Sequence, residues 1–338
     1  MATCDCDNIL PQGSVQEKHY DNCRQVWAER QPAFLPLLKN EDGTIRLINK
    51  NVLDLDKDVL YHFSFTNKSI DLQAEFGDVK FVCTGGTASR LKEFALYMAK
   101  RLGIPADENI KDWTKISNRY SMFKVGPILA FNHGIGIPSM TIAIQEAIKM
   151  LYYAKVKNPI FFRIGTCGGL AVEAGSVVIS EWGLNGLLKK SYDLPVLGNI
   201  YSVPSILDKR LAQEIQLVAS ESNNNFKVYL GGTMGTDDFY RGQGRLDGPF
   251  CNHTEEQKNA FLRKLSDMGV RNIEMEATAF SALMTEAGIR GAIVCVPFLD
   301  RLHGDQVTTP KEQLVEWENN PMKVVGDYIV KYIENQKQ

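Results

Sequence analysis

The chain has 338 residues, of which 44% are hydrophobic and 23% charged, and its formal net charge is −2. This balance favours neither a nucleic-acid surface nor a polybasic membrane patch. No apolar run approaches the roughly 20 residues that span a bilayer, and the acidic start is unlike a secretory signal. The seven cysteines form an odd, scattered set, so we expect reduced thiols, a cytoplasmic protein and no bound metal.

The first part of the chain differs from the rest. Residues 1 to about 50 are polar and have no sustained period, and the stretch 39–43 is typical of a turn or linker. We expect an accessory N-terminal extension over residues 1–50, partly disordered, followed by a single domain over residues 51–338.

From about residue 78 onward, strand patterns alternate with helical ones. Apolar runs predict strands at 79–83, 126–131, 159–164, 176–180, 228–230 and 292–296. Helical spacing predicts helices over 91–102, over 142–151 and from 276 to about 287. This alternation indicates an α/β fold with three layers, helices on both sides of a mixed, mostly parallel central sheet. Because ligands of such sheets bind at the carboxyl ends of strands, we expect the following loops to surround one cleft.

Two of these loops carry an arginine that could bind an anion. After the first strand, glycines at 85 and 86 lead into a helix with Arg90 in its first turn, a geometry that holds oxyanions. Arg163 ends a buried strand, where its charge needs a partner, and Thr166 follows. A solvated Arg90 and a structural bridge from Arg163 to a carboxylate are the alternatives.

The motif that begins at His133 imitates part of a dinucleotide fingerprint. No third glycine follows, Pro138 takes its place, and no acidic residue ends the next strand to hold a ribose. We therefore exclude a dinucleotide cofactor, and we expect His133 to be an ordinary loop histidine.

The loop over residues 237–247 has the richest chemistry. Gln243 offers an acceptor and two donors, Arg245 offers donors only, and Phe239 could stack on a flat ring. An amide beside a guanidinium suits the edge of uracil, with its alternating carbonyls and one N–H. A solvated polar loop is the alternative.

Two carboxylates, Glu274 and Glu276, are two residues apart and flanked by apolar residues. In extended chain they would face the same side. A buried carboxylate needs donors, and the vicinal hydroxyls of a ribose supply two. Since glutamates usually lie on the surface, an exposed pair is an equal alternative.

Taken together in order, seven motifs resemble the nucleoside phosphorylase family, in particular its uridine phosphorylase branch. The resemblance covers residues 55 to 335, and Gln243 with Arg245 separates this branch from the purine-cleaving relatives. The motifs occupy residues 60–63, 85–90, 118–120, 133–139, 163–166, 242–247 and 272–276.

The resemblance implies a role for particular side chains. Phosphate would be bound by Gly86, Arg90, Arg119, Arg163 and Thr166. Ribose would be bound by His62, Met275 and Glu276. Uracil would be bound by Phe239, Gln243, Arg245, Leu299 and Arg301. Catalysis would depend on Arg245, Gln243 and Arg90. His62 and Arg119 would reach in from a partner subunit, which implies a homodimer with shared active sites.

The implied activity is that of a pentosyltransferase, which converts uridine and phosphate reversibly to uracil and ribose 1-phosphate in pyrimidine salvage. Phosphate is then a co-substrate, and no metal or organic cofactor is needed. The alternatives are a purine nucleoside phosphorylase, a nucleoside hydrolase and a catalytically silent nucleoside-binding homologue. This chain departs from the family pattern at Cys167, at Pro297-Phe298 and at Asp300, where an aspartate raises the question of purine cleavage.

Overall fold

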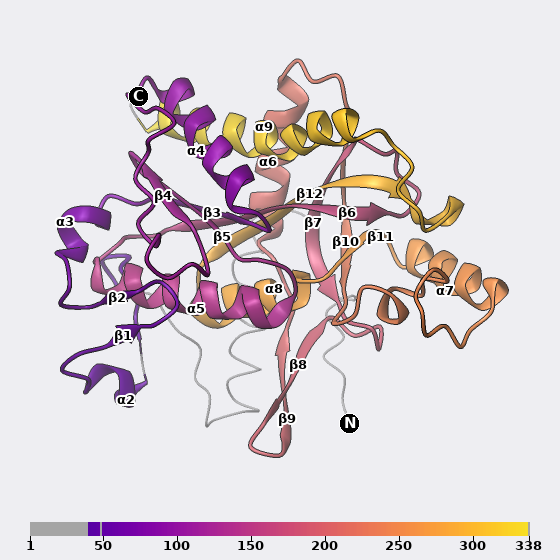
Figure 1. Cartoon of the computed structure of the whole chain (residues 1–338), viewed down its shortest axis with the longest axis horizontal. Coiled ribbons are helices and arrows are strands. Elements are labelled where there is room, and N and C mark those ends of the chain that lie inside the picture. Colours follow the sequence, from indigo (N-terminus) through magenta and orange to yellow (C-terminus); the bar gives the residue numbers. More distant parts are fainter. Residues whose placement is uncertain (1–39, 48, 337–338) are drawn as a thin grey trace.

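The computed structural model describes residues 40–47 and 49–336, and a sheet of eight strands forms its centre (Figure 1). Its strands are β3 (Phe81–Gly85), β4 (Met122–Val125), β5 (Ile128–Asn132), β6 (Ile160–Gly169), β7 (Val177–Leu184), β10 (Val228–Gly235), β11 (Val270–Glu274) and β12 (Arg290–Asp300). Their order across the sheet is β11-β10-β7-β12-β6-β3-β5-β4.

The sheet is mixed and mostly parallel, as the alternation of elements predicts. Strand β3 runs parallel to β5 and β6, β12 to β6, and β10 to β7 and β11. Antiparallel pairs join β4 to β5, β12 to β7 and β11 to β6. The last of these places Asn272 opposite Gly169, so β11, β10, β7, β12 and β6 close into a ring. The carboxyl ends of β6 and β11 therefore meet.

Helices cover both faces of the sheet, so the three-layer prediction is confirmed. On one face lie α4 (Ala88–Leu102), α6 (Lys209–Glu221) and α9 (Lys311–Asn335), and on the other lie α5 (Ile137–Tyr153) and α8 (Ala277–Ala287) (Figure 1). In α4, Leu91, Phe94, Ala95 and Met98 are buried, the spacing of one helix face. Each helical layer has its own apolar core against the sheet.

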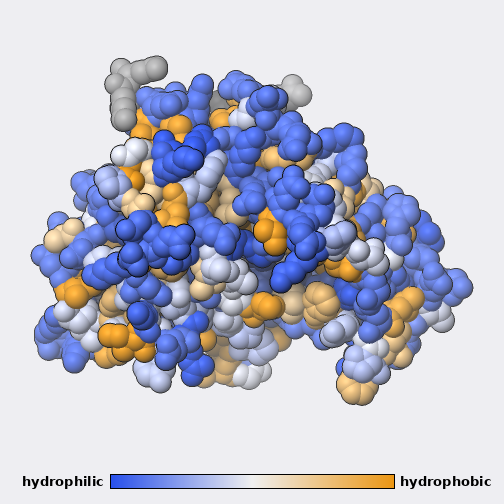
Figure 2. Space-filling model, turned by 45° about the horizontal axis from the view of Figure 1, so that its top comes forward, coloured by the Kyte–Doolittle hydropathy of each residue, from blue (hydrophilic) through white to orange (hydrophobic). Residues whose placement is uncertain are grey.

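Smaller elements surround this body. They are α2 (Lys50–Leu53), β1 (Val59–Leu60), β2 (Phe65–Thr66), α3 (Leu72–Phe76), β8 (Ser191–Val196), β9 (Asn199–Pro204), η1 (Arg241–Gln243), α7 (Glu255–Asp267) and η2 (Arg301–His303). Strands β8 and β9 form a hairpin that projects from the body (Figure 1). In the view of Figure 2 the surface is mostly hydrophilic, and apolar residues appear as separate spots. No helix among the described residues is long and apolar enough to cross a membrane.

Packed residues extend upstream of residue 51, although the sequence predicts that the domain starts at residue 51. Ile45 and Leu47 are buried in the core that α5 and α8 share, and Thr44 pairs with Lys157 in a β-bridge. Two apolar side chains in a polar stretch give too weak a pattern to indicate this packing. The rest of the expected extension, residues 1–39 together with residue 48, lies outside the described residues.

Truncation of Ile45 tests whether this segment belongs to the domain. Because the side chain is 2% exposed, we expect Ile45→Ala to lower the free energy of unfolding by about 2–5 kcal/mol. Leu217→Ala on α6 removes the same three carbons from a side chain that is 60% exposed and should change stability little. Urea denaturation of both variants measures the difference, and equal stabilities would show that residues 44–47 do not support the core.

Candidate active site

Arg163 lies in β6 and is buried between two carboxylates at the end of β11. Its Nη2 atom is 2.9 Å from Glu274 Oε2 and also contacts Glu276, and its Nη1 donates to Cys295 Sγ at 3.2 Å. The backbone N–H of Gly136, where φ is 84°, donates to Glu276 Oε1 at 2.5 Å. The positive φ favours glycine at this position. The bridge from Arg163 to a carboxylate thus exists, and one of its partners is the predicted ribose residue.

The charges of this cluster favour an ionised Glu276. Burial raises the pKa of Glu276. The charges of Arg163 and then of His133 lower it, and the resulting pKa is about 2. Burial raises the pKa of Glu274 well above its usual value, and the neighbouring Glu276 charge adds to this against the opposing effect of Arg163. One guanidinium therefore neutralises one carboxylate, and Glu276 can accept hydrogen bonds from hydroxyl groups.

His133 belongs to this cluster, contrary to the expectation of an ordinary loop histidine. Its side chain is buried, and neither ring nitrogen has a hydrogen-bond partner among the described residues. Burial first, then the charge of Arg163, lowers its pKa to about 4, and Glu276 acts in the opposite direction. His133 is therefore a neutral imidazole, without a hydrogen-bond partner among the described residues, that senses the charges of Arg163 and Glu276. The motif at 133–139 includes this histidine. Its partial similarity to a dinucleotide fingerprint gave no reason to expect a buried imidazole there.

The glycine turn after β3 lies beside the Arg163 cluster. Thr84 is the register partner of Arg163, and Gly85 O accepts from the backbone N–H of His133 at 2.7 Å. A Cβ atom at Gly85 would lie 2.6 Å from Ile164 O, so only glycine fits between the two strands. The turn continues through Gly86 into α4, whose first turn carries Arg90.

A second cluster holds the predicted uracil residues. Arg301 is 1% exposed, and it donates to the side-chain oxygen of Gln243 at 3.3 Å and to its backbone carbonyl at 3.0 Å. Because a guanidinium only donates, this contact fixes the orientation of the Gln243 amide and leaves its NH₂ group as a donor. No described residue accepts from that NH₂ group, which is thus available to a carbonyl of a base.

Arg245 is also buried and held by acids. Its Nε and Nη2 atoms pair with the two carboxylate oxygens of Asp247 at 2.8 and 2.5 Å, and Nη2 also donates to Asp305 O at 2.7 Å. Its guanidinium lies 4.4 Å from the ring centre of Phe239, which is 44% exposed and can cover a ligand. This fork fixes Arg245 and leaves Nη1 for a ligand.

Asp305 ties these arginines together, although the sequence did not single it out. Its carboxylate pairs with Arg301 Nε at 3.0 Å and with Lys258 Nζ at 2.8 Å, and it accepts from the backbone N–H of Leu246 at 3.0 Å. Lys258 comes from α7, so this contact joins two distant segments. Only the fold reveals such a long-range partner.

A bulge in β12 directs its last residues toward this cluster. The register with β6 shifts between Pro297 and Asp300, and bulges of this kind re-aim side chains. Arg301 then packs on Gly168. A Cβ atom added at Gly168 would lie 2.8 Å from Arg301 Cγ and 4.0 Å from Leu299 Cδ2. Since Gly168 belongs to the same strand as Arg163, β6 connects the two clusters.

The departures from the family pattern have structural partners. Asp300 caps η2, because it accepts from the backbone N–H of Leu302 at 3.0 Å and from that of Ala171 at 3.3 Å. Pro297 is the register partner of Cys167 within the sheet. Cys167 is buried, and burial raises the pKa of its thiol well above the usual value, so little reactive thiolate forms.

The remaining predicted residues lie at different places. Thr166 and Met275 are half-buried, and Met275 Cε lies 4.0 Å from the Cβ position of Gly136, next to Glu276. His62 Nδ1 is 2.7 Å from Glu146, and Arg119 is exposed. Among the described residues, no hydrogen bond or ion pair links these last two side chains to either cluster. A role in a partner's site stays a prediction.

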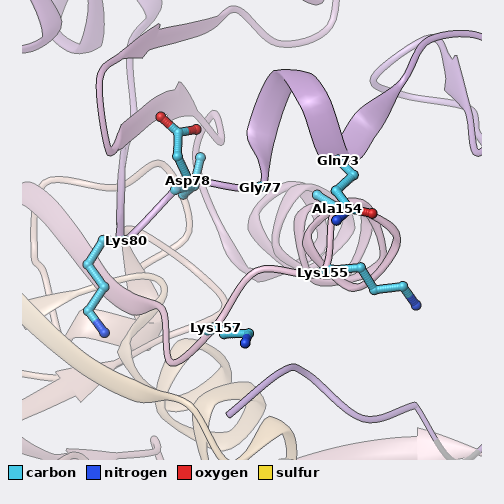
Figure 3. A pocket seen from close by; sticks show the side chains of 8 residues that line it. Gln73, Gly77, Asp78, Lys80, Ala154, Lys155 and Lys157 are labelled. Carbon is cyan, nitrogen blue, oxygen red and sulfur yellow. The ribbon is translucent and has the colours of Figure 1, made fainter. Parts of the chain in front are cut away.

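The described part of the chain has other features that bear on ligands. No group of three or more His, Cys, Asp or Glu side chains there could hold a metal ion. A hollow of about 540 Å³ opens at the amino ends of β3 and β6, next to Lys80, Lys155 and Lys157 (Figure 3). It lies at the opposite ends of these strands from the two clusters and is therefore separate from the candidate site.

The lowered pKa of His133 predicts how stability depends on pH. The pKa of His133 falls from 6.5 in the unfolded chain to about 4 in the folded one. Between these values the unfolded chain binds a proton that the folded chain does not bind. The free energy of unfolding therefore decreases as pH falls from 6.5 toward 4. Between pH 7 and 5 this costs about 2 kcal/mol. We expect His133→Asn to remove that part of the decline in urea denaturation. His303→Asn, on an 82% exposed side chain, should retain it. A decline that is the same in all three proteins would contradict this assignment.

Comparisons with known proteins identify the family of this chain. The model of the Phosphorylase superfamily matches residues 80–331. Uridine phosphorylase 1 of Mus musculus is 44% identical over 295 residues, which cover 86% of this chain and 94% of that protein. A protein of Schistosoma mansoni named inactive uridine phosphorylase B is 38% identical over 84% of this chain and 95% of its own length.

A solved structure extends the similarity to the fold. Uridine phosphorylase from Schistosoma mansoni in complex with 5-fluorouracil superposes with a TM-score of 0.82 at 38% identity, covering 85% of this chain and 99% of that one. The resemblance of the seven motifs is thereby confirmed. The chain belongs to the Phosphorylase superfamily and, within it, to the uridine phosphorylases, which are pentosyltransferases.

Proposed function

We propose that this protein catalyses the reversible phosphorolysis of uridine to uracil and ribose 1-phosphate. One observation carries the proposal: the buried Arg163–Glu276 pair is joined through β6 to the buried Gln243–Arg301 pair. The first offers a cation and an ionised carboxylate, as a phosphate and a ribose need. The second offers the NH₂ group of Gln243 as a fixed donor, which a carbonyl of uracil can accept from.

The reaction needs no covalent intermediate with the enzyme. A phosphate oxygen forms a bond to the anomeric carbon while the bond from that carbon to N1 of uracil breaks. Its electron pair leaves with the base, which then takes up a proton. Arg163 and Arg90, with Gly86 and Thr166, would hold the phosphate. Glu276 and Met275 would hold the ribose on the side of Gly136. This positioning supplies much of the rate enhancement.

Charge develops on the base as it leaves, and donors aimed at that charge lower the barrier. Gln243 and Arg245 fill this role, because both are buried and fixed before the base arrives. Phe239 and Leu299 would cover the ring, and Arg301 would act through Gln243. A preorganised donor pair of this kind costs no reorganisation when the bond breaks.

The same arrangement weighs against the alternatives. Purine cleavage would need an acid near the base, but Asp300 is engaged in the cap of η2. A hydrolase would have no use for arginines directed at phosphate. A silent homologue remains the strongest competitor, because one similar protein is named inactive.

Several further properties belong to this proposal. Phosphate is a co-substrate, and no metal or organic cofactor takes part. The protein works in the cytoplasm as a homodimer, in which His62 and Arg119 complete the partner's site. Among the described residues, the exposed Arg119 and the half-buried His62 have no hydrogen bond or ion pair to the two clusters, which supports this shared arrangement.

A panel of substrates tests the activity. Uridine, thymidine and inosine are each incubated with and without inorganic phosphate, and base release is measured. We expect release of uracil from uridine only when phosphate is present. Release from inosine would favour a purine enzyme, and release without phosphate a hydrolase. Binding of uridine without any release of uracil would identify a silent homologue.

Loss of Arg245 should abolish most of the activity. Removal of one donor to a developing negative charge typically costs about 10²–10³ in rate, so we expect Arg245→Ala to lower kcat by at least that factor. Arg241→Ala serves as the control, because Arg241 lies on the same loop but is exposed. Circular dichroism must show that both variants are folded. Turnover like that of the wild type in Arg245→Ala would refute the base-binding assignment.

A further inference from the structure

Arg90, the arginine after the glycine turn, is held by the C-terminal helix. Its Nη2 atom lies 2.6 Å from Oε1 of Glu318, which belongs to α9, and the two side chains are 12% and 26% exposed. Helix α9 packs on the same face of the sheet as α4 (Figure 1). An acid far along the chain therefore pairs with a side chain that the proposed function assigns to phosphate.

The contact engages only part of the guanidinium group. Glu318 accepts from Nη2 alone, and Arg90 Nε is buried without a partner among the described residues. Asp247, in contrast, engages Arg245 through two parallel hydrogen bonds, the form that stable arginine–carboxylate pairs often take. The pair between Arg90 and Glu318 thus lacks the second bond of a fixed structural bridge.

We propose that Glu318 sets the affinity for phosphate by competing with it for Arg90. A carboxylate and a phosphate present similar oxygen acceptors to a guanidinium, and both are anions. As phosphate binds, it must share Arg90 with a nearby negative charge or displace it. Glu318 therefore weakens phosphate binding, and the inference rests on the proposed phosphate role of Arg90.

The sign of the effect separates this role from a supporting one. If Glu318 only orients Arg90, its replacement weakens phosphate binding, because the arginine becomes mobile. If Glu318 competes, its neutralisation strengthens phosphate binding. Glu318→Gln keeps an oxygen that can accept from Arg90 and removes only the charge, so it isolates the electrostatic part.

The experiment measures phosphate binding in two ways. With Glu318→Gln we expect the KM for phosphate to fall by about three- to tenfold, with kcat and the KM for uridine changed less than about twofold. Isothermal titration of the enzyme with inorganic phosphate alone should show a similar fall in Kd. Glu316→Gln is the matched control, because Glu316 lies on the same helix, is exposed and pairs with Gln313. It should leave every parameter unchanged.

A second variant weakens the contact between Glu318 and Arg90 without removing the negative charge. Glu318→Asp keeps the charge but shortens the side chain, so the ion pair weakens and the KM for phosphate should fall part of the way. An unchanged or raised KM for phosphate in folded variants, with an active wild type, would overturn this inference alone. A wild type that releases no uracil from uridine and phosphate would overturn the proposed function, and this inference with it.

Discussion

The buried ion pairs of Arg163 constrain much of this structure. A guanidinium inside a sheet is costly unless acids neutralise it, and here Glu274 and Glu276 lie at the end of another strand. They reach Arg163 because β11 pairs with the far end of β6 and closes the ring of strands. The backbone N–H groups of Glu276 and Ala277 bind Glu274 and fix the start of α8. The fold and the proposed chemistry therefore depend on the same contact.

The second cluster, around Gln243, Arg245 and Arg301, repeats this principle with local partners. Arg245 is paired with Asp247 two residues later, and Arg301 with Asp305 four residues later. Acids this close in sequence hold each arginine with little dependence on distant packing. The long-range contact of Lys258 with Asp305 then fixes both loops relative to α7. Rigid donors of this kind are what a leaving base requires.

Much of the fold and of the site could be predicted from the sequence. Continuous apolar runs predicted six of the eight strands of the sheet, namely β3, β5, β6, β7, β10 and β12. Helical spacing predicted α4, α5 and α8, because one face of each helix carries a regular apolar pattern. The strands β4 and β11, the hairpin β8–β9 and the helices α6, α7 and α9 were not predicted. The hairpin is only partly buried, and α7 buries few side chains, so both give a weak periodic signal. The motifs singled out Arg163, Glu276, Gln243 and Arg245, which are buried in the two clusters, and their roles stay predictions. The contacts of Asp305 and Glu318 and the burial of His133 were not predicted, because they arise only in the folded chain.

The pairing of the arginines has a consequence for how an anion would approach the candidate site. Arg90, Arg163, Arg245 and Arg301 each lie against at least one carboxylate. Their positive field is therefore largely cancelled beyond a few ångströms, and it gives little long-range attraction. Under the proposed function, capture of phosphate would then depend on short-range exchange of partners at these arginines, and its association rate should change little with ionic strength.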